Sequence, residues 1–369
     1  MSTDDYRLAN PNALQTPCLL AFPAVIRRNV DRMEQLLGGL GRIRPHIKTH
    51  KCKQMIQLLM ARGVDKFKCA TVSEVRLLVE CGVHDIQLAY PLVGPPVKRL
   101  AALLARHRNV GVQVTVDDVG AAAALNAACE EHDRPADVLI DLDVGLHRTG
   151  VAPGPLADEL ARAVAGMSHL RLRGLHAYDG HIRERDVGAR RPLVEAAMAG
   201  PLRMKQQLAD EGLCHGPPIL STSGTLTFIV AKDIDGIDEV TPGTWLLWDG
   251  VYNEIDGARF EFGALVASRV VSRPGENRLT LDAGSKGVSR DLPGPPVVID
   301  RPGLVPGSAN EEHQPCEWQA DGPAPSIGEL ILLGPRHICT TVYLYSQFHV
   351  VEGGEVVDHW AITCRHGDD

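Results

Sequence analysis

The stretch "RIRPHIKTHKCKQM", residues 42–55, places Lys48 between two histidines directly after a short apolar run. A lysine at the mouth of a buried strand, flanked by other cations and partly removed from water, loses its proton more readily. A neutral amine is what Schiff-base chemistry with an aldehyde requires. Lys48 is therefore a candidate for covalent attachment of a carbonyl cofactor, although a solvated basic face shared with Lys51 and Lys53 would give the same letters.

A second chemical signal is "STSGTLTF", residues 221–228, which follows another apolar run. Small residues around Gly224 let backbone N–H groups approach a phosphate, and Ser223 and Thr225 add hydroxyl donors. Taken alone, the stretch is also typical of an ordinary tight turn. Beside a Schiff-base lysine it favours pyridoxal phosphate, a cofactor that needs both an amine partner and a phosphate cup.

The segment "GPRHICTTVYL" places His337 and Cys339 two residues apart in an expected strand, where both side chains would leave the same face. Imidazole and thiolate suit a divalent metal such as zinc, and manganese is the alternative that we consider. A buried cysteine beside a hydrogen-bonded histidine would give the same pattern. An open catalytic site, however, can complete its ligand shell with water and substrate.

A possible proton acceptor occurs in "YDGHI", residues 178–182, at an expected strand end. Asp179 or His181 there could accept a proton or support a metal ligand. The alternative interpretation is an Asp-Gly turn followed by a surface histidine.

Short apolar runs alternate with amphipathic helical segments over the first two thirds of the chain. About eight such units favour an α/β fold with a closed (β/α)8 barrel over an open doubly wound sheet, because no GxGxxG follows the first run. Chemistry in such barrels lies at the C-terminal ends of the strands, where Lys48, Arg148, Tyr178 and Gly224 fall. The expected strands are 18–22, 42–48, 66–70, 86–90, 111–116, 138–145, 170–178, 218–224 and 239–250.

After about residue 255 the pattern changes to alternating strands and turns without comparable helices, which predicts an antiparallel β-domain. Residues 293–326, rich in proline, glycine and acidic side chains, are expected to form a long loop system on it. The predicted organisation is a barrel over residues 18–254 and a β-domain formed by 1–17 and 255–369.

Composition excludes several classes of protein. The net charge of −8 argues against a nucleic-acid-binding protein, which would carry a basic excess. No apolar core of a signal peptide and no run of 18 apolar residues occurs, so we expect a cytoplasmic protein without a membrane partner. The nine cysteines are odd in number and form no CxxC pair, which makes a disulfide framework improbable.

The motif "RPHIKTHK" resembles the cofactor-lysine motif of the D-threonine aldolase and D-serine dehydratase family. This family is the metal-dependent branch of the alanine-racemase-like, fold type III, pyridoxal phosphate enzymes. The similarity continues through "KFKCATVSEV", "LAYPLVGP", "DLDVGLHRTGV", "GLHAYDGH", "STSGTLTF", "VTPGTWLLWDGVY", "LDAGSKG" and "PRHICTTVYL", and so runs over nearly the whole chain.

The resemblance implies a barrel, a C-terminal β-domain completed by the N-terminal segment, and a homodimer with active sites near the subunit interface. It also implies roles for individual residues. Lys48 would form the aldimine, and the divalent metal would lie on His337 and Cys339. The residues implied near the cofactor ring, its phosphate or the substrate are Arg148, His176, Tyr178, Ser223, Gly224, Thr225 and Tyr252.

The implied activity is that of a lyase on D-β-hydroxy-α-amino acids, with D-threonine aldolase-type cleavage to glycine and an aldehyde preferred. Aldolases of the family read "YHG" where this chain has Tyr178-Asp179-Gly180, and they often pair the metal histidine with Asp. Dehydratases favour the His-x-Cys pair but carry a tyrosine where this chain has His176. A D-serine or D-3-hydroxyaspartate dehydratase therefore stays an alternative, as does an amino-acid racemase without a metal.

Overall fold

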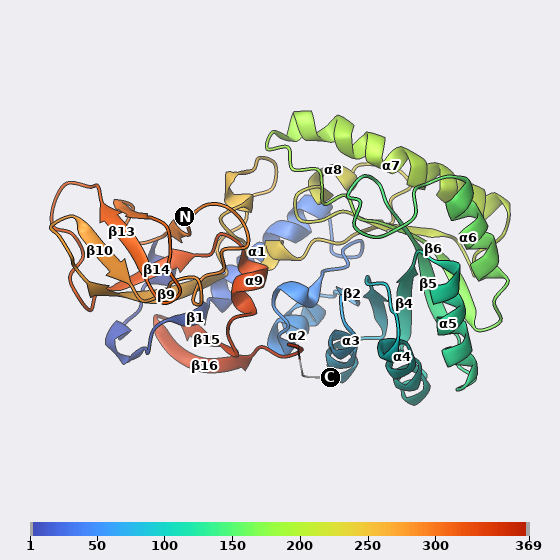
Figure 1. Cartoon of the computed structure of the whole chain (residues 1–369), viewed down its shortest axis with the longest axis horizontal. Helices are drawn as coiled ribbons and strands as arrows, with labels where there is room; N and C mark the ends of the chain where they lie inside the picture. The colour runs from blue at the N-terminus through green and yellow to red at the C-terminus, as the bar shows by residue number, and fades with distance from the viewer. Residues whose placement is uncertain (1–2, 367–369) are drawn as a thin grey trace.

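The computed structural model, which describes residues 3–366, contains a parallel barrel beside a mostly antiparallel β-domain (Figure 1). Within these residues, seven parallel strands follow one another in chain order in the barrel sheet. The expected α/β barrel is confirmed. Its strands are β2 (Lys66–Cys69), β3 (Asp85–Leu88), β4 (Gly111–Val116), β5 (Ala136–Leu142), β6 (Leu170–Ala177), β7 (Ile219–Thr222) and β8 (Glu239–Val240).

Residues 43–46 close the barrel between its first and last strands. Ile43 forms a parallel bridge with Val240 of β8, and His46 forms one with Lys68 of β2. This segment takes the eighth position of the barrel. The strand expected there is thus reduced to two bridges, after which the chain turns into a short 3-10 helix.

A buried charge network holds this closing segment. The fully buried guanidinium of Arg44 donates to Glu239 at 2.6 and 2.8 Å and to Asp85 at 2.8 and 3.1 Å. Lys66 lies 3.4 Å from Glu239. Removing one partner of such a buried pair costs about 3–5 kcal/mol, because the remaining charge is left uncompensated. The network therefore fixes the register from which Lys48 emerges.

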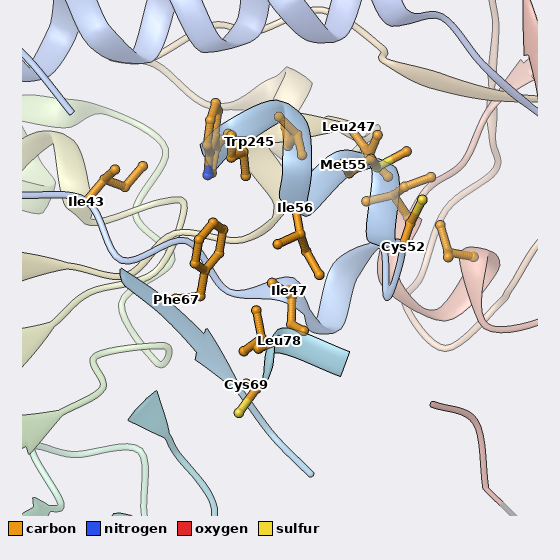
Figure 2. Packing of buried hydrophobic residues seen from close by; sticks show 14 of the residues in the cluster. Ile43, Ile47, Cys52, Met55, Ile56, Phe67, Cys69, Leu78, Trp245 and Leu247 are labelled. Carbon is orange, nitrogen blue, oxygen red and sulfur yellow. The ribbon is translucent and has the colours of Figure 1, made fainter. Parts of the chain in front are cut away.

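Apolar packing fixes the same segment from the outside of the barrel. Ile47 is fully buried against Ile56, Phe67 and Leu78, as Figure 2 shows. Each such side chain contributes about 1.5–3 kcal/mol by leaving water. The 3-10 helix η3 (Ile47–Thr49) is anchored by its two outer residues, which are buried, while the residue between them is exposed.

Helices cover the outer face of the barrel, and α9 lies between the barrel and the β-domain (Figure 1). Among residues 3–366, no helix is long and apolar enough to cross a membrane. The helices are α1 (Pro23–Leu37), α2 (Lys53–Ala61), α3 (Val72–Glu80), α4 (Pro95–Arg106), α5 (Val119–Glu130), α6 (Pro155–Ala165), α7 (Val187–Asp210), α8 (Phe228–Ala231) and α9 (Ile338–Val342).

The second sheet has the order β12-β13-β10-β9-β1-β15-β16, with β14 paired to β9 and β11 paired to β14. Its first strand in the chain, β1 (Cys18–Ala21), pairs antiparallel with β9 and parallel with β15. The other strands are β9 (Ala264–Ser272), β10 (Arg278–Leu281), β11 (Val297–Val298), β12 (Leu304–Pro306), β13 (Gln314–Trp318), β14 (Leu330–Gly334), β15 (Gln347–Glu352) and β16 (Glu355–Ala361).

The placement of β1 corrects one expectation. The run at 18–22 was expected to open the barrel, yet it is a central strand of the β-domain. It is buried along its whole length, as a barrel strand would be. A strand that is buried on both faces consists of apolar residues in either sheet, so the sequence of this run does not indicate which strands it pairs with.

Candidate active site

A cavity of about 1100 Å³ lies at the C-terminal ends of the barrel strands, at the junction with the β-domain. Its volume is sufficient for a cofactor together with a small substrate. Residues from the loops after β5, β6 and β7 contribute to its wall, as expected for a barrel enzyme. Of the residues predicted from the sequence, those lining it are Lys48, Arg148, His176, Tyr178, Asp179, Gly224, Thr225, Tyr252, His337 and Cys339.

Lys48 enters this cavity from η3. Its flanking residues Ile47 and Thr49 are buried, whereas Lys48 is exposed. Its backbone N–H donates to Nδ1 of His46 at 3.4 Å, which ties the turn to the barrel. Within residues 3–366 its amine makes no hydrogen bond or ion pair, so it is available to a cofactor aldehyde.

The turn after β7 has the features of a phosphate cup. Ser223 has a φ of +71°, and its hydroxyl is buried without a hydrogen-bond partner among the described residues. A Cβ on Gly224 would lie 3.1 Å from the ring of Tyr178, closer than a normal packing contact. The left-handed turn brings Gly224 and Thr225 to the cavity wall, whereas Ser223 is fully buried and does not line the cavity. The exposed backbone beside Gly224 and the hydroxyl of Thr225 fit the phosphate of pyridoxal phosphate.

Tyr178, directly after β6, forms a wall of the cavity between cations. The guanidinium carbon of Arg148 lies 5.1 Å from its ring centroid, and the amine of Lys68 lies 5.8 Å from it. Burial raises the pKa of Tyr178, so the phenol stays neutral. A neutral aromatic wall with a cation beside it suits a planar, anionic cofactor.

Lys68 is a second amine in the cavity and is absent from the sequence-based predictions. Its Nζ lies 2.8 Å from Nε2 of His176 and donates to Oγ1 of Thr241 at 2.9 Å. On the other side of the imidazole, Nδ1 of His176 lies 2.6 Å from Oδ1 of Asp141. Burial, together with the charge of Lys48, lowers the pKa of Lys68 to about 7.

His337 and Cys339 line the same cavity, but the expected strand there is wrong. His337 is the N-cap of α9, and Cys339 lies in its first turn. The N–H of Ile338 donates to the buried carboxyl of Asp249 at 3.2 Å, and the N–H of Thr341 donates to the carbonyl of His337 at 3.3 Å. These contacts outweigh the preference of the β-branched residues for a strand.

The imidazole and the thiol interact with one another in spite of the helical backbone. Burial opposes the shift, but the thiol of Cys339 and the carboxylate of Asp291 raise the pKa of His337 to about 9. Burial likewise opposes the shift at Cys339, where His337 lowers the pKa of the thiol. Each group thus favours the charged form of the other, and binding of a cation would release any proton that the pair holds.

The donor set therefore suits a divalent metal, with Asp291 holding the histidine. Nδ1 of His337 lies 2.6 Å from Oδ2 of Asp291, which leaves Nε2 for a metal. Asp291 also accepts from Ser289 at 2.9 Å and from Thr340 at 2.8 Å. Over the part of the chain that the structure describes, no group of three His, Cys, Asp or Glu side chains is placed to hold a metal, so substrate or water would complete the shell.

The two candidate proton acceptors have different surroundings. Asp179 is fully buried; Oδ1 accepts from Thr227 at 2.6 Å, and Oδ2 has no partner among residues 3–366. Burial raises its pKa to about 6. His181 is exposed, does not line the cavity, and lies against the backbone of Gly145. The geometry favours Asp179.

Tyr252 lines the cavity together with His337 and Cys339. Its ring is 5.7 Å from that of Trp248, and burial raises its pKa well above the usual value. Asp249 accepts from the N–H of Tyr252 at 3.1 Å and also holds the start of α9. Burial raises the pKa of Asp249 to about 6. This carboxyl thus links two cavity walls.

Two family models match the chain. The model described as "Alanine racemase, N-terminal domain" matches residues 23–249, and the model described as "Putative serine dehydratase domain" matches residues 263–351. A D-threonine aldolase from Arthrobacter sp is 31% identical over 359 residues, covering 95% of this chain and 93% of that protein. The chain belongs to the D-threonine aldolase and D-serine dehydratase family. It is by family a pyridoxal phosphate-dependent lyase.

Other members of this family are similar over comparable lengths. A D-threo-3-hydroxyaspartate dehydratase from Delftia sp. (strain HT23) is 29% identical and covers 94% of this chain and 97% of its own. The crystal structure of a D-threonine aldolase from Filomicrobium marinum has a TM-score of 0.89 at 30% identity, over 95% of this chain and 96% of that one. Both aldolases and dehydratases are thus similar to this chain.

The family residues predicted from the sequence, apart from Ser223, line one cavity, whereas their supporting partners are found only in the structure. These partners come from several strands and loops, and their only sequence signal was an isolated polar residue, as for Lys68 and Asp141 within apolar runs. The functional candidates that the sequence-based predictions lack are Lys68, Asp141, Thr227, Thr241, Asp249 and Asp291.

Proposed function

We propose that this protein cleaves D-β-hydroxy-α-amino acids to glycine and an aldehyde, as a D-threonine aldolase-type lyase. Pyridoxal phosphate would be attached to Lys48, and a zinc or manganese ion would be held by His337 and Cys339. The observation that carries the proposal is the 3.2 Å contact between Oγ1 of Thr49 and Sγ of Cys339. It brings the residue next to the cofactor lysine against a metal-ligand candidate.

This arrangement suits a substrate that carries an amine and a hydroxyl on neighbouring carbons. The amine end would lie toward Lys48, and the hydroxyl end toward the imidazole and thiol. When bound, the cofactor supplies an electron sink for the bond broken at Cα, and the metal polarises the β-hydroxyl. The similarity to the Arthrobacter D-threonine aldolase supports this assignment.

The residues of the chain would position the substrate and remove one proton. Arg148 and Arg183 line the cavity and can pair with the substrate carboxylate. Asp179 can accept the hydroxyl proton at Oδ2, because Thr227 already occupies its other oxygen. With a pKa of about 6, this carboxyl is ionised at neutral pH and acts as a base.

A dehydratase is the second candidate, and Cys339 is the observation that favours it. The family's dehydratases carry the His-x-Cys pair, and the Delftia D-threo-3-hydroxyaspartate dehydratase is 29% identical to this chain. In that reaction the Cα proton is removed and the β-hydroxyl departs. The products would be a 2-oxo acid and ammonia.

Product identification distinguishes these activities. The purified protein, loaded with pyridoxal phosphate and with Zn²⁺ or Mn²⁺, is incubated with D-threonine and separately with D-serine. Glycine with an aldehyde supports the aldolase, whereas a 2-oxo acid with ammonia assigns the dehydratase. Formation of the L-enantiomer alone, unaffected by a chelator, would contradict both and indicate a racemase.

A further inference from the structure

We propose that Lys68 contacts the ring nitrogen of bound pyridoxal phosphate, and that Asp141, acting through His176, positions the amine for this contact. The inference rests on the proposed attachment of the cofactor at Lys48. It assigns a function to a buried lysine that neither the aldolase nor the dehydratase reaction described above employs.

The position of Lys68 is set by the barrel register. Lys68 forms a parallel bridge with His46, two residues before Lys48, and therefore lies one step deeper along the barrel axis. Its side chain is buried but reaches the cavity, as do those of His176 and Thr241. These three polar side chains form a layer beneath the exposed amine of Lys48.

The geometry of the cofactor directs its nitrogen toward this layer. In pyridoxal phosphate, the ring nitrogen lies opposite the carbon that carries the aldehyde, and the phosphate arm is on the neighbouring carbon. An aldehyde at Lys48 and a phosphate at the turn of Ser223 leave the far ring edge directed into the barrel. That edge needs a polar partner, because a buried pyridine nitrogen without a hydrogen bond is costly.

The hydrogen bonds leave Lys68 one site for that partner. Burial lowers the pKa of His176, so its neutral form gives its Nδ1–H to Asp141, and Nε2 accepts from Lys68. Thr241 gives its hydroxyl proton to the carbonyl of Ser223 at 2.7 Å, and so accepts from Lys68. The third site of the amine points away from both acceptors and is the one available to the cavity.

The charges around Lys68 allow the third hydrogen-bonding position of its amine to act as a donor or as an acceptor. A pKa of about 7 allows the ammonium to donate to an unprotonated ring nitrogen and the neutral amine to accept from a protonated one. In either form a single proton lies between the two nitrogens. The ionisable groups that interact with Lys68 include Arg44, His46, Lys48, Asp141, Arg148, His176 and Asp179.

The test uses pyridoxal phosphate labelled with ¹⁵N in the ring, reconstituted into wild type, Lys68→Met, Asp141→Asn and Lys66→Met. Lys66 is the matched control: it lies on the same strand, and its partly exposed amine is 3.4 Å from Glu239, a carboxylate that Arg44 still holds at 2.6 and 2.8 Å when Lys66 is removed. In the wild type the ring-nitrogen resonance should titrate near neutral pH. In Lys68→Met this step should vanish, and the cofactor dissociation constant should rise about 10- to 100-fold, as for a lost charged hydrogen bond.

Asp141→Asn should shift the pH midpoint of the ring-nitrogen titration. Lys66→Met should leave this midpoint in place and change the cofactor dissociation constant by no more than about two-fold. A Lys68→Met protein with the wild-type resonance and affinity overturns the proposal, as does an equal effect of Lys66→Met. Should Lys68→Met not fold, Lys68→Arg carries a fixed charge, and retention of the step in that variant overturns the proposal. Product identification with D-threonine is a separate measurement, so a failure of the aldolase assignment is recognised independently.

Discussion

Oγ1 of Thr49 lies 3.2 Å from Sγ of Cys339, across the junction between the barrel and the β-domain. The two residues are 290 positions apart in the chain. Oγ1 of Thr244 lies 3.7 Å from the same sulfur, so the thiol is enclosed from the barrel side. The exposed amine of Lys48 and the thiol–imidazole pair of Cys339 and His337 therefore line one cavity.

Cys339→Ala should weaken the binding of Zn²⁺ or Mn²⁺ by more than about 100-fold, since losing even an outer partner of a metal ligand costs 10- to 100-fold. The visible absorbance of bound pyridoxal phosphate should persist, because Lys48 is unchanged. Metal affinity is measured by competition with a chelator. Cys214→Ala, which alters a half-buried thiol outside the cavity, is the control. Equal affinities in the wild type and Cys339→Ala would remove Cys339 from the site.

Asp291→Ala should reduce metal affinity about 10- to 100-fold, because His337 loses the carboxylate that orients its ring. The same competition assay measures the effect. Glu312→Ala is the matched control, since Glu312 is an exposed carboxylate paired with Lys286. If both variants bound the metal as the wild type does, Asp291 would have no part in holding His337 for the metal.

Thr227→Val should move the acid limb of the pH–rate profile to higher pH. Burial raises the pKa of Asp179 to about 6, and the hydroxyl of Thr227 favours its charged form. Without this donor the pKa rises further, so the base is lost at a higher pH as the solution is acidified. A bond worth about 1.5–3 kcal/mol corresponds to a shift of about 1–2 pH units.

The Thr227→Val profile is measured at saturating cofactor, because Thr227 also accepts from the N–H of Gly224. Thr115→Val is the control, since its hydroxyl donates only weakly to a strand carbonyl at 3.5 Å. An acid limb that stays in place in Thr227→Val, or that persists in Asp179→Asn, excludes Asp179 as the titrating base.

Glu74→Ala should lower the free energy of unfolding by about 3–5 kcal/mol, because it leaves the buried ammonium of Lys51 without its partner. Glu74 pairs with Lys51 and accepts from the N–H of Ala70 at 2.6 Å. Lys51 in turn donates to the carbonyl of Cys364 at 3.2 Å, joining the cofactor segment to the C-terminal segment. Urea denaturation measures the change.

The control for this pair is Glu80→Ala, which removes an exposed carboxylate on the same helix, 3.9 Å from Arg76. An exposed pair of this kind is worth about 0–1 kcal/mol. A loss in Glu74→Ala no larger than the loss in Glu80→Ala would mean that the buried pair does not hold the segment.

The barrel strands and the position of Lys48 at the barrel mouth were accessible from the sequence for a physical reason. Parallel strands buried on both faces give short apolar runs, and β2 through β8 fall within the expected ranges or one or two residues from them. A strand end at a barrel mouth then places Lys48, Tyr178 and Gly224 at one end of the fold. These features depend on local sequence, so the pattern of short apolar runs predicts them.

Features that depend on distant partners were not accessible. β1 has the apolar sequence of a barrel strand, but the strands that it pairs with, β9 and β15, lie more than 200 residues later in the chain. The helix at His337 and Cys339 depends on the buried carboxyl of Asp249. Lys68 stands in an apolar run, and only the position of His176 shows that its amine has a buried acceptor.

The attachment of the cofactor to Lys48 is tested most directly by reducing the holoenzyme with borohydride and mapping the modified lysine by mass spectrometry. Lys68 is the alternative site of attachment within the same protein, because its amine lies in the same cavity. We predict that the pyridoxyl group is found on the peptide containing Lys48 and is absent from Lys48→Ala. A pyridoxyl group on Lys68, or no reducible adduct, would contradict the account.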